Sequence, residues 1–333
     1  MRPGNIPPVE LLTNLPVATS AGACFTSDLR GNGQYIYYFV PTAAATAQFW
    51  RYDVFANTWQ QLANPGTFAA TARFVAGCAL RYDASASVPL GGAAGPNIWL
   101  FHPDSAAPWA EFQVYNIASN TWVNGSQAGG AFTAGGLGGA ALAAQWTTDA
   151  AITHPCTALN PTVSDDFIYL TGNAATFFYR YTISTGTVAA MTAHGATAGP
   201  GCTLAWLPSN QDRLFYQRGN ATNTWEYYGI VGNNWNAVTP IPNTETYTTG
   251  TAMIGDVARG VFIVRKSALA GEQIKFYDFN YSTSALTPCG TAYQGEGTPH
   301  VGSLIALTRV GSQKYVFVGK QTSVDFQRVW IVE

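Results

Sequence analysis

The sequence reads Gln48-Phe49-Trp50-Arg51-Tyr52-Asp53-Val54-Phe55-Ala56-Asn57-Thr58-Trp59 at the place that decides its fold. Tyr52 and Val54 alternate with polar neighbours, as in a strand that buries one face. Asn57 marks a tight turn, and Trp59 opens a returning strand. The stretch therefore predicts a β-hairpin with a large apolar residue at each end.

This hairpin pattern recurs along the chain. A tyrosine is followed by a large apolar residue seven positions later in four copies and nine positions later in a fifth. The five pairs are Tyr52 and Trp59, Tyr115 and Trp122, Tyr181 and Val188, Tyr228 and Trp235, and Tyr277 and Leu286. A hairpin with one apolar face cannot bury that face alone, so the copies are expected to stack on one another.

Two further short strands are expected before each hairpin, an aromatic one and, before that, one that opens with small residues. The aromatic strands are 35–40, 97–101, 167–170, 213–216, 261–264 and 315–318. The small-residue strands are 21–25, 76–80, 155–159, 201–205, 250–254 and 302–305. The tyrosines advance by 63, 66, 47 and 49 residues, close to the roughly 45–50 residues of a four-stranded propeller blade. Six small-residue strands predict six blades, with these strands lining the crowded axis.

The two ends of the chain are expected to meet in one blade. Residues 325–333 read as a third strand with no fourth strand after it, and residues 9–16 align without gaps on 235–242. We therefore predict an all-β, six-bladed β-propeller of four-stranded antiparallel blades, a single domain over residues 1–333. In it the N-terminal strand, about 9–16, completes the blade formed by about 301–333 and hides its open edge.

Composition limits the classes of partner. Charged residues make up 10% of the 333 residues, and the net charge is −2 with no acidic or basic run. This argues against a nucleic-acid surface or an anionic-membrane surface. No stretch is apolar enough to insert in a membrane, and residues 1–8 do not resemble a secretion signal. The odd count of five cysteines argues against a disulfide framework.

One insertion stands apart from the repeats. Residues 124–154 form a Gly/Ala-rich connection that is too apolar for an ordinary solvated linker. Two interpretations stay open: a flexible surface loop, or an arm that becomes ordered against a partner.

The repeats resemble kelch repeats, which carry Tyr-Asp before a turn and Asn-Thr-Trp after it. Tyr52-Asp53 with Asn57-Thr58-Trp59 matches this pattern, and Tyr115-Asn116 with Asn120-Thr121-Trp122 nearly matches it. The paired glycines that kelch repeats carry after the second strand are absent. The resemblance spans almost the whole chain and implies a propeller architecture more than any activity.

No catalytic, cofactor-binding or metal-binding site is expected. The histidines have no partner at ligand spacing, although three of the four precede small-residue strands and are expected on one face. They are His102, His154, His194 and His300. Four cysteines occupy one equivalent place beside the axis, where a small residue is needed. The few carboxylates before strands, Asp165, Asp166 and Asp212, are interpreted as turn caps.

Sparse charge favours a protein that is covered by other subunits, because interface cores exclude charge. We therefore expect a non-enzymatic structural or interaction propeller whose partners are other protein subunits. The favoured setting is a bacteriophage virion, as a tail, collar or capsid-decorating protein made in the host cytoplasm. The alternatives are a carbohydrate-binding propeller, lectin-like or receptor-binding, and a propeller-type oxidase or hydrolase. The loop residues expected to contact a partner or glycan are Trp109, Trp146, His154 and His300.

Overall fold

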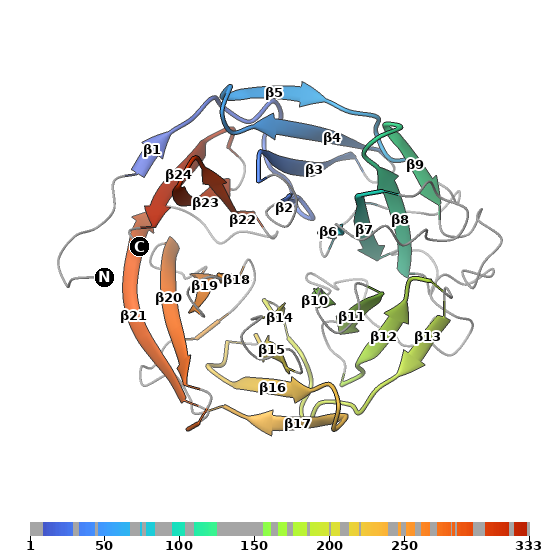
Figure 1. The fold of residues 1–333 in the computed structure, drawn as a ribbon, viewed down its shortest axis with the longest axis vertical. Coiled ribbons are helices and arrows are strands. Elements are labelled where there is room, and N and C mark those ends of the chain that lie inside the picture. The colour runs from blue at the N-terminus through green and yellow to red at the C-terminus, as the bar shows by residue number, and fades with distance from the viewer. Residues whose placement is uncertain are drawn as a thin grey trace.

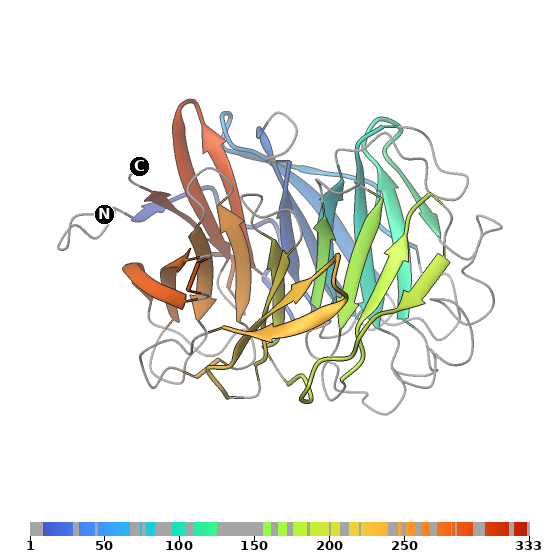
Figure 2. The ribbon, with the colours of Figure 1, turned by 60° about the horizontal axis from the view of Figure 1, so that its bottom comes forward.

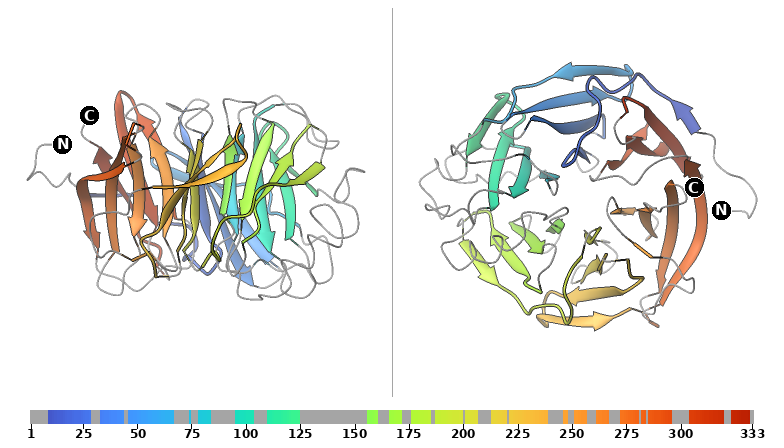
Figure 3. Two further views of the ribbon diagram at one scale, coloured as in Figure 1. Left: turned by 90° about the horizontal axis from the view of Figure 1, so that it is seen from below. Right: turned by 180° about the vertical axis from the view of Figure 1, so that it is seen from behind.

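The computed structural model describes residues 9–28, 33–43, 46–66, 74, 78–83, 95–103, 110–124, 156–160, 166–171, 176–184, 187–199, 201–206, 213–219, 221–238, 246–247, 251–256, 261–266, 272–280, 282–283, 285–295, 304–319 and 323–331. Within these residues the chain is an all-β propeller of four-stranded antiparallel blades arranged around an axis (Figure 1). The 24 described strands form six such sheets. Figure 2 and Figure 3 show the sheets standing side by side around that axis.

Each blade contributes one strand to each of four layers, from the axis outward. The innermost strands are β2 (Cys24–Ser27), β6 (Ala79–Asp83), β10 (Cys156–Asn160), β14 (Thr203–Trp206), β18 (Ala252–Asp256) and β22 (Ile305–Val310). The second strands are β3 (Tyr35–Ala43), β7 (Asn97–Pro103), β11 (Phe167–Thr171), β15 (Arg213–Gln217), β19 (Val261–Lys266) and β23 (Gln313–Gly319). The third strands are β4 (Thr46–Asp53), β8 (Ala110–Asn116), β12 (Tyr179–Thr182), β16 (Trp225–Gly229), β20 (Glu272–Asn280) and β24 (Phe326–Ile331). The outermost strands are β5 (Thr58–Gln61), β9 (Thr121–Asn124), β13 (Thr187–Ala190), β17 (Asn234–Ala237), β21 (Ala285–Gly295) and β1 (Val9–Leu11).

The small-residue strands are the innermost ones, as their composition predicts. Cys24, Cys78 and Cys202 are buried at or beside these strands. Ala23 and Cys24 have no exposed surface. Small side chains are suited to this layer because inner strands of several blades crowd together near the axis.

The hydrophobic core lies between blades, because each strand alternates its side chains between two neighbours. Ile36, Tyr38 and Tyr52 of the β2–β5 blade cluster with Phe317 and Phe326 of the preceding blade. The residues between them face the other way. Tyr37, Phe39 and Phe49 cluster with Leu80, Ile98 and Leu100 of the following blade.

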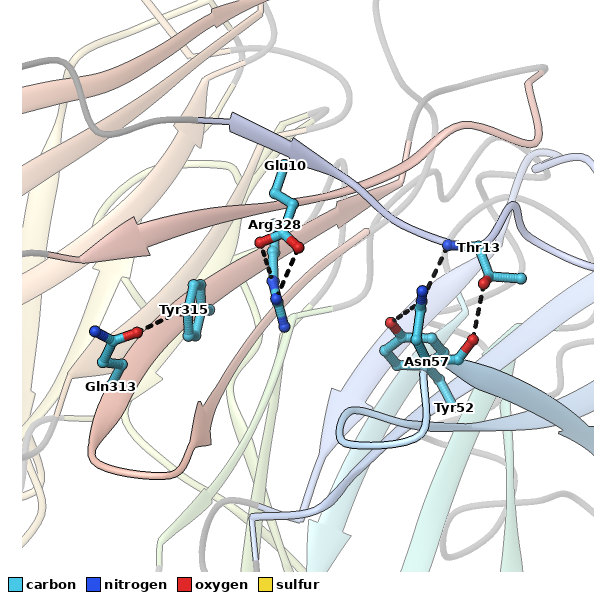
Figure 4. A network of polar contacts seen from close by, with 7 residues as sticks. All are labelled: Glu10, Thr13, Tyr52, Asn57, Gln313, Tyr315 and Arg328. Carbon is cyan, nitrogen blue, oxygen red and sulfur yellow. Dashed lines mark hydrogen bonds and ion pairs between the residues drawn. The ribbon is translucent and has the colours of Figure 1, made fainter.

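The N-terminal strand completes the blade that the C-terminal strands begin, as expected. Strand β1 pairs antiparallel with β24, with Glu10 opposite Arg328. Beyond the strand, the amide of Leu12 donates to the carbonyl oxygen of Phe326 at 3.0 Å, and that of Leu15 donates to Val324 at 2.7 Å. The Glu10 carboxylate also accepts two hydrogen bonds from Arg328, at 2.8 and 2.9 Å (Figure 4).

A buried ion pair joins this blade to the one before it. Lys314 of β23 lies 2.8 Å from Asp256 at the end of β18, and both side chains are 2% exposed. A charge that far from water is costly unless it is paired, so the contact favours one docking geometry for the two blades.

The fifth hairpin, whose apolar residue comes two positions late in the sequence, pairs differently from the other four. Leu286 pairs with Phe279, and Tyr277 pairs with Pro288. In the other four hairpins the tyrosine pairs directly with the apolar residue seven positions on. Strand β20 also carries two register shifts, between Ile274 and Lys275 and between Phe276 and Tyr277. The nine-residue spacing marks this hairpin as different in the sequence, but it does not locate the two register shifts.

The Gly/Ala-rich connection expected over 124–154 lies outside the described residues apart from Asn124, so its two interpretations stay predictions.

Candidate interaction surface

Three hairpins are held by the same set of contacts around one asparagine. Asn57, Asn120 and Asn233 each have a left-handed backbone, with φ of 54°, 54° and 48°. Asparagine tolerates this conformation better than most residues. In the first hairpin the Tyr52 hydroxyl donates to Asn57 Oδ1 at 2.6 Å. The equivalent bonds are Tyr115 to Asn120 at 2.7 Å and Tyr228 to Asn233 at 2.6 Å.

The same asparagine also binds the preceding blade. The amide of Thr13 donates to Asn57 Oδ1 at 3.1 Å, and the Thr13 hydroxyl donates to the Asn57 carbonyl oxygen at 2.7 Å (Figure 4). The indole N–H of Trp59 returns a bond to the Thr13 carbonyl oxygen at 3.3 Å. Equivalent contacts join Ala63 to Asn120 and Trp122, and Thr192 to Asn233 and Trp235. We call each Tyr–Asn–Trp set an interblade latch.

An aromatic ring of the preceding blade packs against the tyrosine and the tryptophan of each latch. Phe49 lies against Tyr115 and Trp122, with ring centroids 4.9 and 5.0 Å apart and edge-to-face geometry. The same role is taken by Phe326 against Tyr52 and Trp59, and by Phe178 against Tyr228 and Trp235. The three tryptophans are thus packing residues, as the repeat positions indicate, and each also donates a hydrogen bond between blades.

The turn of the first latch is hydrogen-bonded at Asp53 and carries an exposed apolar side chain. The Asp53 carboxylate accepts from the amides of Phe55 at 2.9 Å and Ala56 at 3.0 Å. Phe55, three residues after the tyrosine, is nevertheless 59% exposed. At the same position of the β16–β17 hairpin, which carries the latch of Asn233, Val231 is 84% exposed.

We call this position of the β4–β5, β8–β9, β12–β13 and β16–β17 hairpins the hairpin rim. It consists of Phe55, Ala118, Ser184 and Val231, all exposed. The two large apolar members belong to blades on opposite sides of the ring (Figure 1). Phe55 and Val231 are two of the three large apolar side chains that are exposed among the described residues, the third being Leu11 of β1, so the rim is a candidate surface for contact with another protein.

Of the four histidines, His194 is the one whose side chain the structure describes. It is buried between two blades. Its Nδ1 donates to the Ala196 carbonyl oxygen at 2.7 Å, and its Nε2 lies 2.8 Å from the Thr171 hydroxyl. Its ring stacks on Tyr216, with centroids 5.0 Å apart. Burial lowers the pKa of His194, and nearby Arg218 lowers it further. The residue is therefore a neutral packing element that joins the β10–β13 and β14–β17 blades.

Three carboxylates, Asp165, Asp166 and Asp212, are predicted from the sequence to cap turns, and the structure describes one of them, Asp166. Asp166 accepts from the amide and the hydroxyl of Ser184, at 2.6 and 2.5 Å, which confirms its interpretation as a turn cap. Asp165 and Asp212 lie outside the described residues. Among the residues that the structure describes, no group of three or more histidine, cysteine or acidic side chains is arranged to hold a metal ion.

Trp109, Trp146, His154 and His300, the loop residues expected to contact a partner or glycan, all lie outside the described residues. The hairpin rim was not anticipated from the sequence. The signal that points to it is present in the repeat itself: an apolar residue three positions after the tyrosine, in a turn that needs none. Within the described part of the chain, no helix has the length and apolarity to span a bilayer.

Comparisons with known proteins identify the architecture. No protein-family model matches the chain, and no curated protein matches its sequence. A solved structure described as "Crystal Structure of Mitotic Checkpoint Complex" contains a chain that superposes with a TM-score of 0.60 and 11% identity, over 100% of this chain and 97% of that one. Another, described as "Structure of YjhT", gives a TM-score of 0.58 and 12% identity over 97% of both chains. At such identities the likeness shows the β-propeller fold alone.

Proposed function

We propose that this protein is a non-enzymatic structural or interaction propeller, a subunit of a larger assembly. The observation that carries the proposal is the exposure of Phe55 and Val231 on turns whose asparagines, Asn57 and Asn233, are hydrogen-bonded to the neighbouring blade. Turns held by such hydrogen bonds position these side chains before binding, and a preformed contact surface has a lower ordering cost. The partners proposed are other protein subunits.

The favoured assembly is a bacteriophage virion, in which the chain would serve as a tail, collar or capsid-decorating protein. Supporting this is the scarcity of charge, 10% of residues, which suits surfaces covered by neighbouring subunits. We further propose that each of the six sheets is one blade of a six-bladed ring, and that its hairpins derive from a kelch-like repeat. The Tyr-x4-Asn-x-Trp spacing of the latches supports that relationship.

The proposal is tested by purifying particles on a density gradient from cultures that produce the protein. The expected result is that the chain co-migrates with the particles at a fixed ratio to their major protein, as measured by quantitative mass spectrometry. Recovery only at the top of the gradient, as free protein, would contradict the virion assignment. If the free protein still bound another subunit through the hairpin rim, the proposed interaction role would stand and the virion assignment would fall.

A further inference from the structure

The connectors that carry the three interblade latches differ in chemistry at one buried position. Two residues after the latch residue, the first two connectors have apolar side chains and the third has a histidine. The latch residues are Thr13, Ala63 and Thr192, and the residues two positions later are Leu15, Pro65 and His194, all buried. The amides of Leu15 and His194 also make equivalent bonds, to the carbonyl oxygens of Val324 at 2.7 Å and Thr176 at 3.0 Å. One of three equivalent latches therefore carries a titratable ring.

The hydrogen-bonding partners of His194 assign its proton to Nδ1 in the neutral state. The Ala196 carbonyl oxygen, 2.7 Å from Nδ1, can only accept a hydrogen bond. A neutral imidazole then has a lone pair at Nε2, which accepts from the Thr171 hydroxyl at 2.8 Å. That hydroxyl also lies 2.9 Å from the Phe177 carbonyl oxygen, and its one proton cannot serve both acceptors. Neutral His194 thus draws the hydroxyl proton away from Phe177.

Uptake of a proton at Nε2 reverses this arrangement. The new Nε2–H donates to the Thr171 oxygen, and the hydroxyl proton turns to the Phe177 carbonyl oxygen, both within the present distances. The hydrogen bonds are then all satisfied, but the positive charge is placed on a ring that is 2% exposed. Its two bonding partners, a carbonyl and a hydroxyl, are neutral, so the charge is not compensated by an anion bonded to it.

The charged groups around this seam do not favour an imidazolium. Burial has the largest effect on the pKa of His194 and lowers it, and Arg218, directly after β15, lowers it further against the opposing Ala196 hydrogen bond. The acidic group is Glu226 of β16, the cross-strand partner of Tyr216, on which the His194 ring stacks. Burial raises the pKa of Glu226, so its carboxylate loses its charge at a higher pH than an exposed one. Other titratable groups at the seam are the neutral side chains of Tyr169, Tyr216, Tyr228 and Cys202 and the cation of Arg180.

His194 is joined to the latch both by a ring contact and through the chain. Its ring meets that of Trp235 edge-on, with centroids 5.6 Å apart. The Trp235 indole N–H donates to the Thr192 carbonyl oxygen at 2.8 Å. Thr192 in turn donates to Asn233 through its amide at 2.9 Å and its hydroxyl at 2.6 Å. Movement of the ring into water therefore removes packing from Trp235 and displaces the short connector that holds Asn233.

We infer that His194 is an acid-sensitive element that releases the latch between the β10–β13 and β14–β17 blades. In the closed seam its imidazole is neutral, whereas in the open seam it is solvated and takes up a proton with its ordinary pKa of about 6.5. The closed seam is fully favoured above that pH and loses its advantage as the pH falls toward the lowered pKa of the closed state. The latches that carry Leu15 and Pro65 have no such group and stay closed. The inference does not depend on the proposed function, because the opening is measured without a partner.

The first experiment compares the three latch tryptophans in one wild-type sample. The indole N–H cross-peaks of Trp59, Trp122 and Trp235 are assigned with Trp→Phe variants, and their hydrogen exchange is measured by NMR at pH 7.5 and 5.5. Each rate is divided by that of N-acetyltryptophanamide at the same pH, which gives a protection factor. We expect the protection factor of Trp235 to fall about tenfold, the gain in proton binding of a solvated histidine over this range. Equal changes at all three tryptophans, or no change at Trp235, would overturn the inference.

The second experiment removes the titratable ring. His194→Leu copies the latch of Leu15, and His194→Gln keeps a hydrogen-bonding group beside Thr171. In either variant the protection factor of Trp235 should no longer depend on pH between 7.5 and 5.5. Persistence of the acid effect in a folded variant would assign it to another group and overturn the inference, and the wild-type comparison decides the matter if neither variant folds.

A third measurement tests the position of the proton. Long-range ¹H–¹⁵N NMR spectra of the wild type at pH 7.5 should show His194 with a proton on Nδ1 and none on Nε2. As the pH is lowered, protonation of Nε2 should accompany the loss of Trp235 protection. A proton on both nitrogens at pH 7.5, or protonation of Nε2 with Trp235 still fully protected, would overturn the inference.

Discussion

The Tyr52 hydroxyl donates to Asn57 Oδ1 at 2.6 Å, and that oxygen also accepts from the Thr13 amide of the preceding blade. One side chain therefore fixes the turn of its own hairpin and the position of its neighbour. The same arrangement recurs at Asn120 and Asn233. A repeated polar contact of this kind sets the angle between blades, which apolar packing alone leaves less well defined.

Asn57→Ala should lower the free energy of unfolding by about 3 kcal/mol, because it leaves two donors unsatisfied and puts alanine at positive φ. Asn57→Gly keeps the backbone conformation and should cost less. Tyr52→Phe should cost about 1 kcal/mol in the wild type and almost nothing in Asn57→Gly, as measured by chemical denaturation in a double-mutant cycle. Additive costs would show that Tyr52 and Asn57 do not act together.

Lys314→Met should lower the free energy of unfolding by about 3–5 kcal/mol, because the Asp256 carboxylate is left charged and buried. Replacing both partners, as Lys314→Met with Asp256→Leu, should recover most of that loss. Denaturation midpoints of the two single variants and the double variant check this. A double variant as unstable as the sum of the single ones would contradict a role based on charge pairing.

His194 should make the protein less stable as the pH falls below about 6.5, its ordinary pKa. Its folded pKa is lowered by burial, so the unfolded chain binds the proton more readily. The stability from neutral His194 is complete above pH 6.5 and is lost as pH falls toward the folded pKa. Between pH 7.5 and 5.5 the melting temperature of the wild type should therefore fall more than that of His194→Gln. If the melting temperatures of the two proteins fell equally with pH, His194 would not be the titrating group.

Phe55→Ser and Val231→Ser should leave the melting temperature nearly unchanged, because both side chains are largely exposed. They should nevertheless weaken incorporation into the assembly at least tenfold if the rim is the contact surface. Ala118→Ser, at the same turn position, is the matched control and should incorporate normally. Incorporation of the double variant Phe55→Ser/Val231→Ser at the wild-type level would rule out the rim as that surface.

The fold is predictable from the sequence because the same hairpin pairing sets both the spacing of the repeat and the burial of its aromatic residues. Tyr52 and Trp59 are buried or half-buried partners across a hairpin, and their spacing is visible in the sequence wherever the turn length is kept. The alignment of residues 9–16 on 235–242 likewise anticipated the pairing of β1 with β24. Local pattern and long-range pairing agree here, which is typical of repeat architectures.

The functional surface was less accessible to the same reasoning. Asn57 was recognised as a turn residue, but its bonds to Thr13 depend on how two blades meet, and no local pattern encodes that. Residues chosen for chemical type alone, such as Trp109 and Trp146, remain untested predictions.

The most direct test of the central claim is a cryo-EM reconstruction of the chain in its native assembly. The account predicts a propeller whose hairpin rim, including Phe55 and Val231, is covered by a neighbouring protein subunit. A reconstruction in which the chain is part of a particle but the rim faces solvent on every copy would contradict it.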